Sequence, residues 1–131
     1  MEIKIVQIPK IEDPRGNLSV IEHDVVPFDI KRVYYLYDVP AGAERGGHAH
    51  KQLKQFLVAL SGSFDVILND GQKEKVVTLN KPFEGLLISK GIWRELKNFS
   101  SGAVCLVVAS DVFSEADYIR DFNEFLAISS K

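Results

Sequence analysis

Two histidines that stand one residue apart are the residues of this chain best suited to chemistry. His48 and His50 lie in the stretch GAERGGHAHKQLKQFLVALSG, residues 42–62. In a β-strand, side chains at i and i+2 point to the same face, so the two imidazoles would stand side by side. A histidine, with a pKa of about 6.5, can take and return protons at neutral pH, and it is also a common metal ligand. We expect the pair to face a pocket; a pair held by core hydrogen bonds is the alternative.

Length and composition are those of an ordinary soluble globular protein. The 131 residues allow one domain, residues 1–131, with its own hydrophobic core. The net charge of −2 offers no basic surface for nucleic acid or anionic lipid. No apolar run approaches the roughly 20 residues of a membrane helix, and the polar start MEIKIVQIPK does not resemble a signal peptide. The single cysteine, Cys105, can form no internal disulfide, which favours a reducing cytoplasm. From the charge and the lack of a long apolar run, we expect no nucleic-acid or membrane partner.

Short β-patterned runs separated by turn signals fill most of the chain. Besides the histidine stretch, we expect strands at residues 1–8, 18–22, 30–39, 55–60, 64–68, 75–79, 85–89, 93–98 and 103–110. Asp70-Gly71 favours a hairpin between 64–68 and 75–79. Only the tail from Ser114 has helical spacing, which predicts a C-terminal helix or irregular helical turns. This pattern predicts an all-β fold, a sandwich or barrel of the jelly-roll type with a short C-terminal helix.

The expected strand over residues 30–39 divides its side chains between two faces. One face carries Arg32, Tyr34 and Leu36, and the other carries Val33, Tyr35 and Tyr37. Because an arginine does not normally sit on an apolar face, the face of Arg32 is either solvent or a polar cavity.

The histidine stretch resembles the first sequence motif of the cupins. Its glycines, histidines and glutamine, at positions 42, 48, 50, 55 and 62, reproduce the spacing of that motif. In metal-binding cupins a glutamate usually stands at the position of Gln55. The second cupin motif places a third histidine near the position that Arg94 occupies here.

These two departures from the cupin motifs bear on whether the site could bind a metal ion. A catalytic metal needs about three protein ligands and an open position. Gln55 is a poor ligand, and Arg94 is a cation that would repel a metal ion. We therefore expect no metal and no other cofactor, which leaves the imidazoles free to carry protons.

A finer resemblance covers nearly the whole chain, from about residue 10 to residue 125. The ordered motifs DPRG, IKRVYYLYDV, ERGGHAHK, the tail of the hairpin, GIWRE and VVASDVFSEADYIRDF resemble those of the cupin-type sugar 3,4-ketoisomerases. The resemblance implies a metal-free homodimeric jelly roll that moves the ketone of dTDP-4-keto-6-deoxyglucose from C4 to C3. The 3-keto product would feed an aminotransferase in the biosynthesis of 3-amino-3,6-dideoxy sugars, for cell-surface glycans such as lipopolysaccharide or S-layer glycan.

This reaction assigns roles to the residues that could move protons. We expect His48 to be the principal base, with His50 shuttling a proton or orienting the sugar, although the spacing does not fix which histidine does which. Tyr34 offers a phenol as hydrogen-bond donor or general acid.

The nucleotide needs separate anchors, because a pyrophosphate is best recognised by guanidinium groups. Arg45, Arg15 and Arg94 are the candidates, and Arg32 joins them if its face lines the cavity. Two alternatives stay open: Arg15 could complete a turn with Asp13, and Arg32 could be a solvated surface residue.

Trp93 has two interpretations as well, since it could stack on the thymine or pack at the mouth of the barrel.

Two other functions fit a cupin with this motif. A dTDP-sugar 3,5-epimerase also abstracts a proton next to a C4 ketone, and a non-catalytic cupin could bind a sugar nucleotide without turnover. The HAHK pattern and the DYIR tail favour the ketoisomerase.

Overall fold

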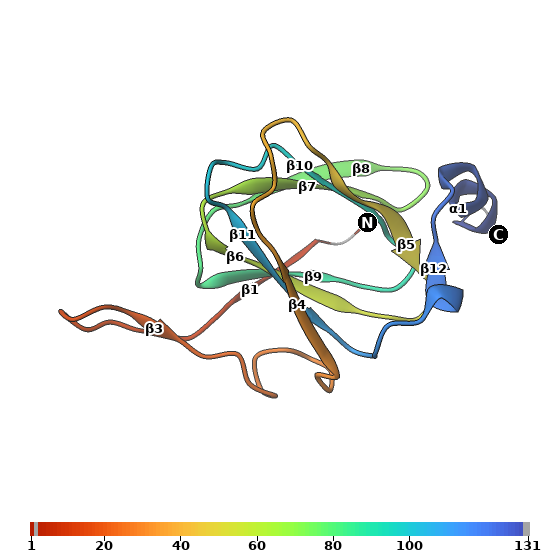
Figure 1. The fold of residues 1–131 in the computed structure, drawn as a ribbon. Helices are drawn as coiled ribbons and strands as arrows, with labels where there is room; N and C mark the ends of the chain where they lie inside the picture. The colour runs from red at the N-terminus through yellow and green to blue at the C-terminus, as the bar shows by residue number, and fades with distance from the viewer. Residues whose placement is uncertain (2, 130–131) are drawn as a thin grey trace.

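Two five-stranded antiparallel sheets form the body of the protein (Figure 1). The computed structural model describes residues 1 and 3–129. The first sheet contains, in spatial order, β1 (Lys4–Gln7), β9 (Glu84–Ile88), β6 (Gln55–Ser61), β11 (Val104–Ala109) and β4 (Arg32–Leu36). The second contains β12 (Tyr118–Ile119), β5 (Arg45–His50), β10 (Trp93–Lys97), β7 (Phe64–Asn69) and β8 (Glu74–Leu79). A small hairpin of β2 (Lys10–Ile11) and β3 (Leu18–Ser19) extends from this body, and helix α1 (Phe122–Ser129) follows β12.

The main core fills the space between the two sheets. Leu57 and Leu86 of the first sheet pack with Val66, Leu68 and Leu96 of the second, and all five are buried. In β6, Leu57 and Ala59 belong to this core, whereas Phe56 and Val58 belong to a second buried cluster, so this strand is apolar and buried on both faces. The two sheets are therefore held together by hydrophobic burial over much of their inner faces.

The predicted all-β jelly-roll fold with a short C-terminal helix is confirmed. The hairpin expected across Asp70-Gly71 is present, with Phe64 opposite Leu79 and Asn69 opposite Glu74. The predicted strand over residues 1–8 is shorter, β1 alone, and residue 2 lies outside the described residues. The boundaries 1–131 of a single domain stay a prediction, because residues 130 and 131 also lie outside the residues that the structure describes.

The tail contains the irregular helical turn and the helix that were predicted, but the helical prediction was wrong for Tyr118 and Ile119. Ser114 precedes only a three-residue 3-10 turn, Glu115–Asp117. The next two residues form β12, in which Tyr118 pairs with His50 and Ile119 with Ala49. The edge of β5 offers unpaired backbone groups, and pairing with them outweighs the helical spacing of the tail.

Helix α1 covers the outer side of the second sheet. Phe125 of α1, Trp93 of β10, Ala49 of β5 and Ile119 of β12 form a small cluster, and each of them is at most 5% exposed. Among the described residues, no helix has the length and the apolar content needed to cross a membrane.

A substitution at Gly85 tests the packing inside the first sheet. A Cβ atom at this position would collide with the ring of Phe56, which is fully buried. We expect Gly85→Ala to lower the free energy of unfolding by about 1–3 kcal/mol, the usual cost of overpacking. Urea unfolding followed by circular dichroism measures this change.

The control is the same substitution in a Phe56→Leu background, where the smaller side chain leaves room for the methyl group. Gly85→Ala should cost less there, since the two positions share one contact. An equal cost in both backgrounds would contradict the predicted collision.

Candidate active site

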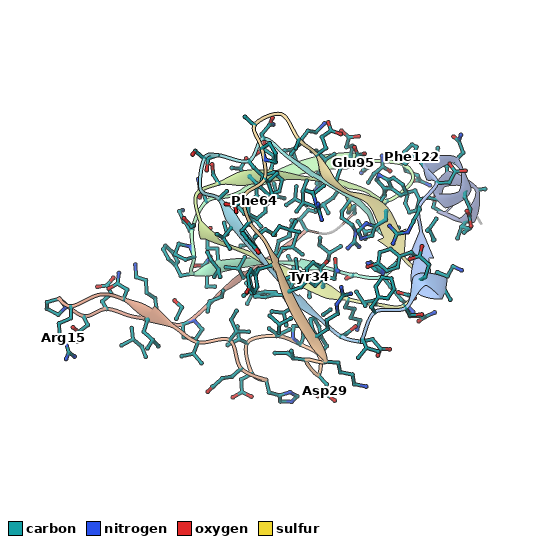
Figure 2. All side chains as sticks on the ribbon, in the orientation of Figure 1. Arg15, Asp29, Tyr34, Phe64, Glu95 and Phe122 are labelled. Carbon is teal, nitrogen blue, oxygen red and sulfur yellow. The ribbon has the colours of Figure 1, made fainter. Side chains whose placement is uncertain are left out.

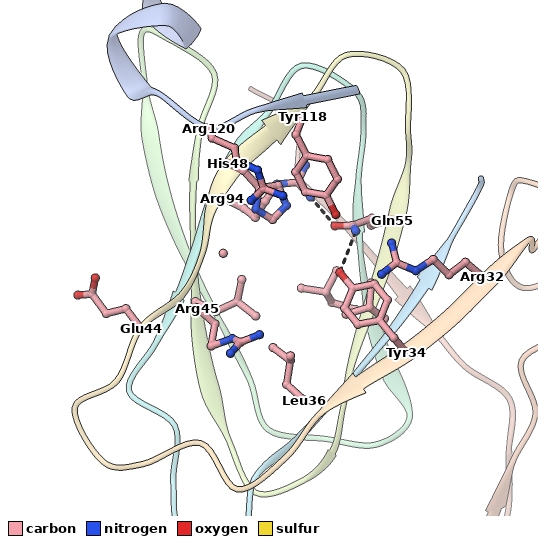
Figure 3. Close-up of a pocket in the computed structure, with 14 residues that line it drawn as sticks. Arg32, Tyr34, Leu36, Glu44, Arg45, His48, Gln55, Arg94, Tyr118 and Arg120 are labelled. Carbon is pink, nitrogen blue, oxygen red and sulfur yellow. Dashed lines mark hydrogen bonds between the residues drawn. The ribbon is translucent and has the colours of Figure 1, made fainter. Parts of the chain in front are cut away.

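A pocket of about 470 Å³ opens between the two sheets (Figure 3). Four arginines, Arg32, Arg45, Arg94 and Arg120, contribute to its lining, together with Tyr34, Tyr118, His48 and Gln55. Among the described residues that line it, Glu44 is the one carboxylate, and Figure 3 shows its side chain pointing away from Tyr34. The pocket is therefore cationic and suited to an anionic ligand.

Strand alternation places the β4 residues as predicted. Arg32, Tyr34 and Leu36 line the pocket, so the polar-cavity interpretation of this face is correct. Tyr35 and Tyr37 are 59% and 62% exposed on the opposite face. The guanidinium of Arg32 lies 4.5 Å from the centroid of the Tyr34 ring, a cation–π contact at the pocket wall.

A close approach between β5 and β10 brings His48 opposite Arg94. Gly46 has φ +82°, and a Cβ atom there would lie 3.1 Å from both the Arg94 carbonyl and a Leu96 methyl group. Glycine at this position lets the two strands pair closely. The pairing shifts its register between Arg94 and Glu95, and Arg94 then stands opposite His48.

The two histidines share a face but differ in their access to the pocket. Their ring centroids lie 4.8 Å apart at an interplanar angle of 85°. His48 lines the pocket, whereas His50 is 0% exposed and does not line it. The Nε2 atom of each ring is buried and has no hydrogen-bond partner among the described residues.

His50 is fixed from behind by a carboxylate. Its Nδ1 lies 3.1 Å from Oδ2 of Asp117. The backbone N–H groups of Gln52 and Leu53 donate to the same carboxylate at 2.9 and 3.3 Å. Because a carboxylate only accepts hydrogen bonds, Nδ1 of His50 carries the hydrogen and Nε2 keeps its lone pair.

Both imidazoles are neutral at pH 7. Burial, followed by the charge of Arg94, lowers the pKa of His48 from 6.5 to about 3. The same two causes lower the pKa of His50 to about 4, although its hydrogen bond to Asp117 opposes them. A neutral imidazole beside a pocket is a base ready to accept a proton.

A chain of hydrogen bonds connects Arg94 to Tyr34. Arg94 is 1% exposed, and its Nε and Nη2 donate to the carbonyl oxygen of Ile92 at 3.3 and 3.0 Å. Its Nη1 donates to Oε1 of Gln55, and Nε2 of Gln55 donates to Oη of Tyr34 at 3.1 Å. Burial lowers the pKa of Arg94 to about 10, so the guanidinium stays charged at neutral pH.

Most of the predicted site residues come together here. His48, Tyr34, Arg32, Arg45 and Arg94 line one pocket. Arg94 differs from the others because its guanidinium is committed to protein partners.

Arg15 does not line this pocket in the single chain. It lies on the β2–β3 hairpin, which projects away from the body (Figure 2). Its side chain is exposed, and Nε is 2.9 Å from Oδ1 of Asp13. The structure thus shows the alternative role, in which Arg15 completes a turn with Asp13.

Trp93 also lies outside the pocket, so its expected place on the thymine is wrong for this structure. Successive strand residues point to opposite faces, and Arg94 points inward. Trp93 therefore packs on α1, with ring centroids 5.2 Å from Phe122 and 5.7 Å from Phe125. Its indole N–H donates to Glu95 at 3.1 Å.

Sequence reasoning missed three residues of the tail. Tyr118 and Arg120 line the pocket, and Asp117 contacts His50. The guanidinium of Arg120 lies 4.1 Å from the Tyr118 ring centroid and pairs with Glu115. The DYIR tail was the available signal, but the helical interpretation of this segment gave its side chains no role.

The chemistry of the site follows from these side chains. A neutral imidazole, a phenol and several fixed cations can move protons on an anionic substrate and stabilise an oxyanion. Within the described part of the chain, no three or more histidine, cysteine, aspartate or glutamate side chains are grouped to hold a metal ion. The expected absence of a cofactor stays a prediction.

Known proteins are similar to this chain in both sequence and fold. The family FdtA, described as "WxcM-like, C-terminal", matches residues 1–130. A TDP-4-oxo-6-deoxy-alpha-D-glucose-3,4-oxoisomerase of Aneurinibacillus thermoaerophilus is 47% identical over 126 residues, 95% of this chain and 91% of the relative.

Solved structures agree with this family match. A 3,4-ketoisomerase from Helicobacter canadensis has a TM-score of 0.96 and 46% identity, covering 100% of this chain and 99% of that one. A His-to-Asn mutant of the 3,4-ketoisomerase QdtA from Thermoanaerobacterium thermosaccharolyticum, in complex with TDP-4-keto-6-deoxyglucose, has a TM-score of 0.96 and 39% identity, with coverages of 98% and 94%. By contrast, a dTDP-4-dehydrorhamnose 3,5-epimerase from Bacillus anthracis, at 16% identity and a TM-score of 0.78, shares the fold alone.

The lowered pKa values of the histidines predict how stability depends on pH. Unfolding returns His48 and His50 to a pKa of about 6.5, so between pH 6.5 and about 4 the unfolded chain binds protons that the folded chain does not. As the pH falls through this window, each histidine lowers the free energy of unfolding by up to about 1.4 kcal/mol per pH unit. Above pH 7 this contribution vanishes. Urea unfolding between pH 7.5 and pH 5 measures the slope.

His48→Gln should remove roughly half of that slope, by the same linkage argument. His23→Gln, which replaces a histidine with a 79% exposed side chain, is the matched control and should keep it. A parental stability that stays constant from pH 7 to pH 5 would show that the two rings are not held neutral.

Proposed function

This chain belongs to the FdtA family, and we propose that it is a sugar-nucleotide isomerase that moves the ketone of dTDP-4-keto-6-deoxy-D-glucose from C4 to C3. The observation that carries the proposal is the neutral imidazole of His48 at the wall of an arginine-rich pocket, with an Nε2 atom that has no hydrogen-bond partner among the described residues. A base next to cationic and phenolic donors is what proton transfer beside a ketone requires.

The reaction balances without any oxidant or cofactor. Nε2 of His48 removes the hydrogen at C3 as a proton, the C3–H electrons form a C3=C4 double bond, and the C4 carbonyl oxygen becomes the oxyanion of an enediolate. The hydroxyl proton at O3 passes to O4, the imidazolium returns its proton to C4, and the carbonyl re-forms at C3. The net change is a shift of ketone and hydroxyl between adjacent carbons.

The electrostatics of the pocket suit both halves of this cycle. Before proton transfer, burial and Arg94 keep His48 neutral and able to accept the proton. As the enediolate forms, its negative charge favours the imidazolium and opposes the effect of Arg94. Tyr34 lines the same pocket and supplies the phenol that we assign to the developing oxyanion.

The diphosphate of the nucleotide is the part of the substrate that the arginines of the pocket are suited to bind. Arg45 and Arg32 line the pocket, and Arg120 adds a third cation at its upper side in Figure 3. We assign Arg45 and Arg32 to the pyrophosphate, because their guanidinium groups can form bidentate, charge-assisted hydrogen bonds. Arg120 already donates two hydrogen bonds to the carboxylate of Glu115. Arg94 instead acts as a fixed charge behind the sugar, since its hydrogen bonds are already made inside the protein.

A homodimer is part of the proposal. The outer face of β4 exposes Val33 and Tyr35, and Tyr37 directly after it is exposed as well, each more than half accessible; the β2–β3 hairpin exposes Ile11 and Leu18. A second copy of the chain would cover this apolar surface, which lies at a sheet edge.

The metabolic setting follows from the product. A 3-keto sugar is the substrate that an aminotransferase needs to make a 3-amino-3,6-dideoxy sugar, so we place the protein in deoxysugar biosynthesis for a surface glycan. A cytoplasmic location is included in the proposal, because the free thiol of buried Cys105 fits a reducing compartment.

Incubation with dTDP-4-keto-6-deoxyglucose in deuterium oxide, followed by proton NMR, tests the reaction. The ketoisomerase should form a 3-keto sugar, with deuterium entering at C3 or C4. The His48→Asn variant should lose at least about 10²-fold in rate, because general-base catalysis of this kind contributes that much.

Deuterium at C5 without a 3-keto product would identify an epimerase, and tight binding without any exchange would identify a non-catalytic cupin. His23→Gln is the control for His48→Asn and should retain the parental rate. Isomerisation by His48→Asn at the parental rate would remove the base assignment.

The dimer has its own test. The parental protein should elute with the mass of two chains in size-exclusion chromatography with light scattering, and a Val33→Lys, Tyr35→Lys variant should elute as one chain because its β4 face is charged. Val76→Lys, at a 59% exposed position on β8, an edge strand of the second sheet, should remain dimeric. A parental monomer would refute the dimer.

A further inference from the structure

Gln55 occupies a position that the reaction described above does not explain. It is the first residue of β6, is 3% exposed, and is one of three buried polar or charged residues among those described, with His50 and Arg94. Its side chain lies inside the barrel between Arg94 of the second sheet and Tyr34 of its own sheet (Figure 3). A buried amide costs free energy unless both of its ends are hydrogen-bonded, and here both are.

The orientation of this amide is decided by its neighbour. A guanidinium has only donors, so the amide atom that faces Arg94 must be the oxygen. The Nη2 and Nε atoms of Arg94 are held by the Ile92 carbonyl, which prevents the guanidinium from turning away. The NH₂ group of Gln55 therefore faces Tyr34, and a flipped amide would set donors against donors.

The orientation of the amide in turn decides whether the hydroxyl group of Tyr34 accepts or donates the hydrogen bond with Gln55. An NH₂ group can only donate, so Oη of Tyr34 accepts a hydrogen bond at 3.1 Å. The hydroxyl hydrogen of Tyr34 must then point elsewhere. Arg32, whose guanidinium lies 4.5 Å from the centroid of this ring, has only donors and cannot accept that hydrogen.

We propose that Gln55 is a positioning residue that makes Tyr34 a hydrogen-bond donor toward the pocket, aimed at the sugar oxygen that becomes negatively charged. This inference rests on the proposed ketoisomerase function, whose enediolate needs such a donor. The charge of Arg94 reaches Tyr34 through the same amide, and each bond of the chain polarises the next.

The ionisation of Tyr34 agrees with this arrangement. Burial raises the pKa of the phenol, which keeps it protonated at neutral pH, whereas the hydrogen bond from Gln55 acts in the opposite direction. A phenol that stays protonated but is polarised by a donor behind it is a stronger hydrogen-bond donor in front.

Gln55→Glu should reverse the direction of the hydrogen bond between residue 55 and Tyr34, with almost no change in the shape of the side chain. The carboxylate would still accept from Arg94, but it would also accept the hydroxyl hydrogen of Tyr34, so the phenol could no longer donate into the pocket. We expect kcat to fall by about 10²-fold, the effect of losing one oxyanion donor, with little change in KM. Gln72→Glu, which adds the same charge in the exposed turn between β7 and β8, is the matched control and should keep the parental kcat.

A double variant separates positioning from a general structural effect. Tyr34→Phe should lose about as much kcat as Gln55→Glu, and adding Tyr34→Phe to Gln55→Glu should cost nothing more, because both remove the same donated hydrogen bond. Losses that multiply independently, or a Gln55→Glu variant with the parental kcat, would overturn the proposal.

A second measurement uses the protein without substrate and does not depend on the proposed function. With 3-fluorotyrosine in place of tyrosine, ¹⁹F NMR follows each phenol through its titration, and Tyr34→Phe identifies the signal of Tyr34. In Gln55→Met, which removes the donor and adds no charge, the pKa of Tyr34 should rise above the parental value. An unchanged or lower pKa would overturn the proposal even in an active isomerase, whereas a raised pKa in a protein without isomerase activity would support the hydrogen-bond polarity and refute only the proposed reaction.

Discussion

The buried guanidinium of Arg94 is the constraint on which the rest of the pocket depends. A cation with 1% exposure must find its hydrogen-bond partners inside the protein, because an unpaired buried charge costs several kcal/mol. The carbonyl of Ile92 and the amide of Gln55 supply those partners, and Gln55 belongs to the opposite sheet. The contact that satisfies the charge therefore also joins the two sheets at the pocket.

The same charge lowers the pKa of His48, the residue that we propose as the base. Burial disfavours the imidazolium of His48, and the charge of Arg94 disfavours it further, so His48 is neutral. Its Nε2 atom has no hydrogen-bond partner among the described residues. A fixed cation would hinder a base if the reaction left the site with a net positive charge. In the proposed reaction, enediolate formation would place a negative charge beside the new imidazolium, and Arg94 would then face a compensated pair of charges. The arrangement favours proton transfer only when an oxyanion develops with it.

Local patterns predicted the fold and part of the site. Period-two alternation in β4 placed Arg32 and Tyr34 together, and Asp70-Gly71 fixed the hairpin of β7 and β8. These features depend on neighbours in sequence, where side-chain direction follows from backbone geometry. The same rule could have corrected one error: Trp93 and Arg94 are adjacent in a strand, so they cannot both face the pocket.

The tail could not be predicted in this way, because a distant partner sets its structure. β12 has two residues, too few to show an alternation, and it exists only because the edge of β5 accepts it. That pairing carries Asp117 to the back of His50 and brings Tyr118 and Arg120 to the pocket wall. His50 is consequently enclosed between Asp117, at 3.1 Å, and the ring of Tyr118, at a centroid distance of 4.4 Å. Two histidines that look equivalent in sequence are thus distinguished by a non-local strand pair: His48 lines the pocket, and His50 is enclosed behind it, outside the pocket lining.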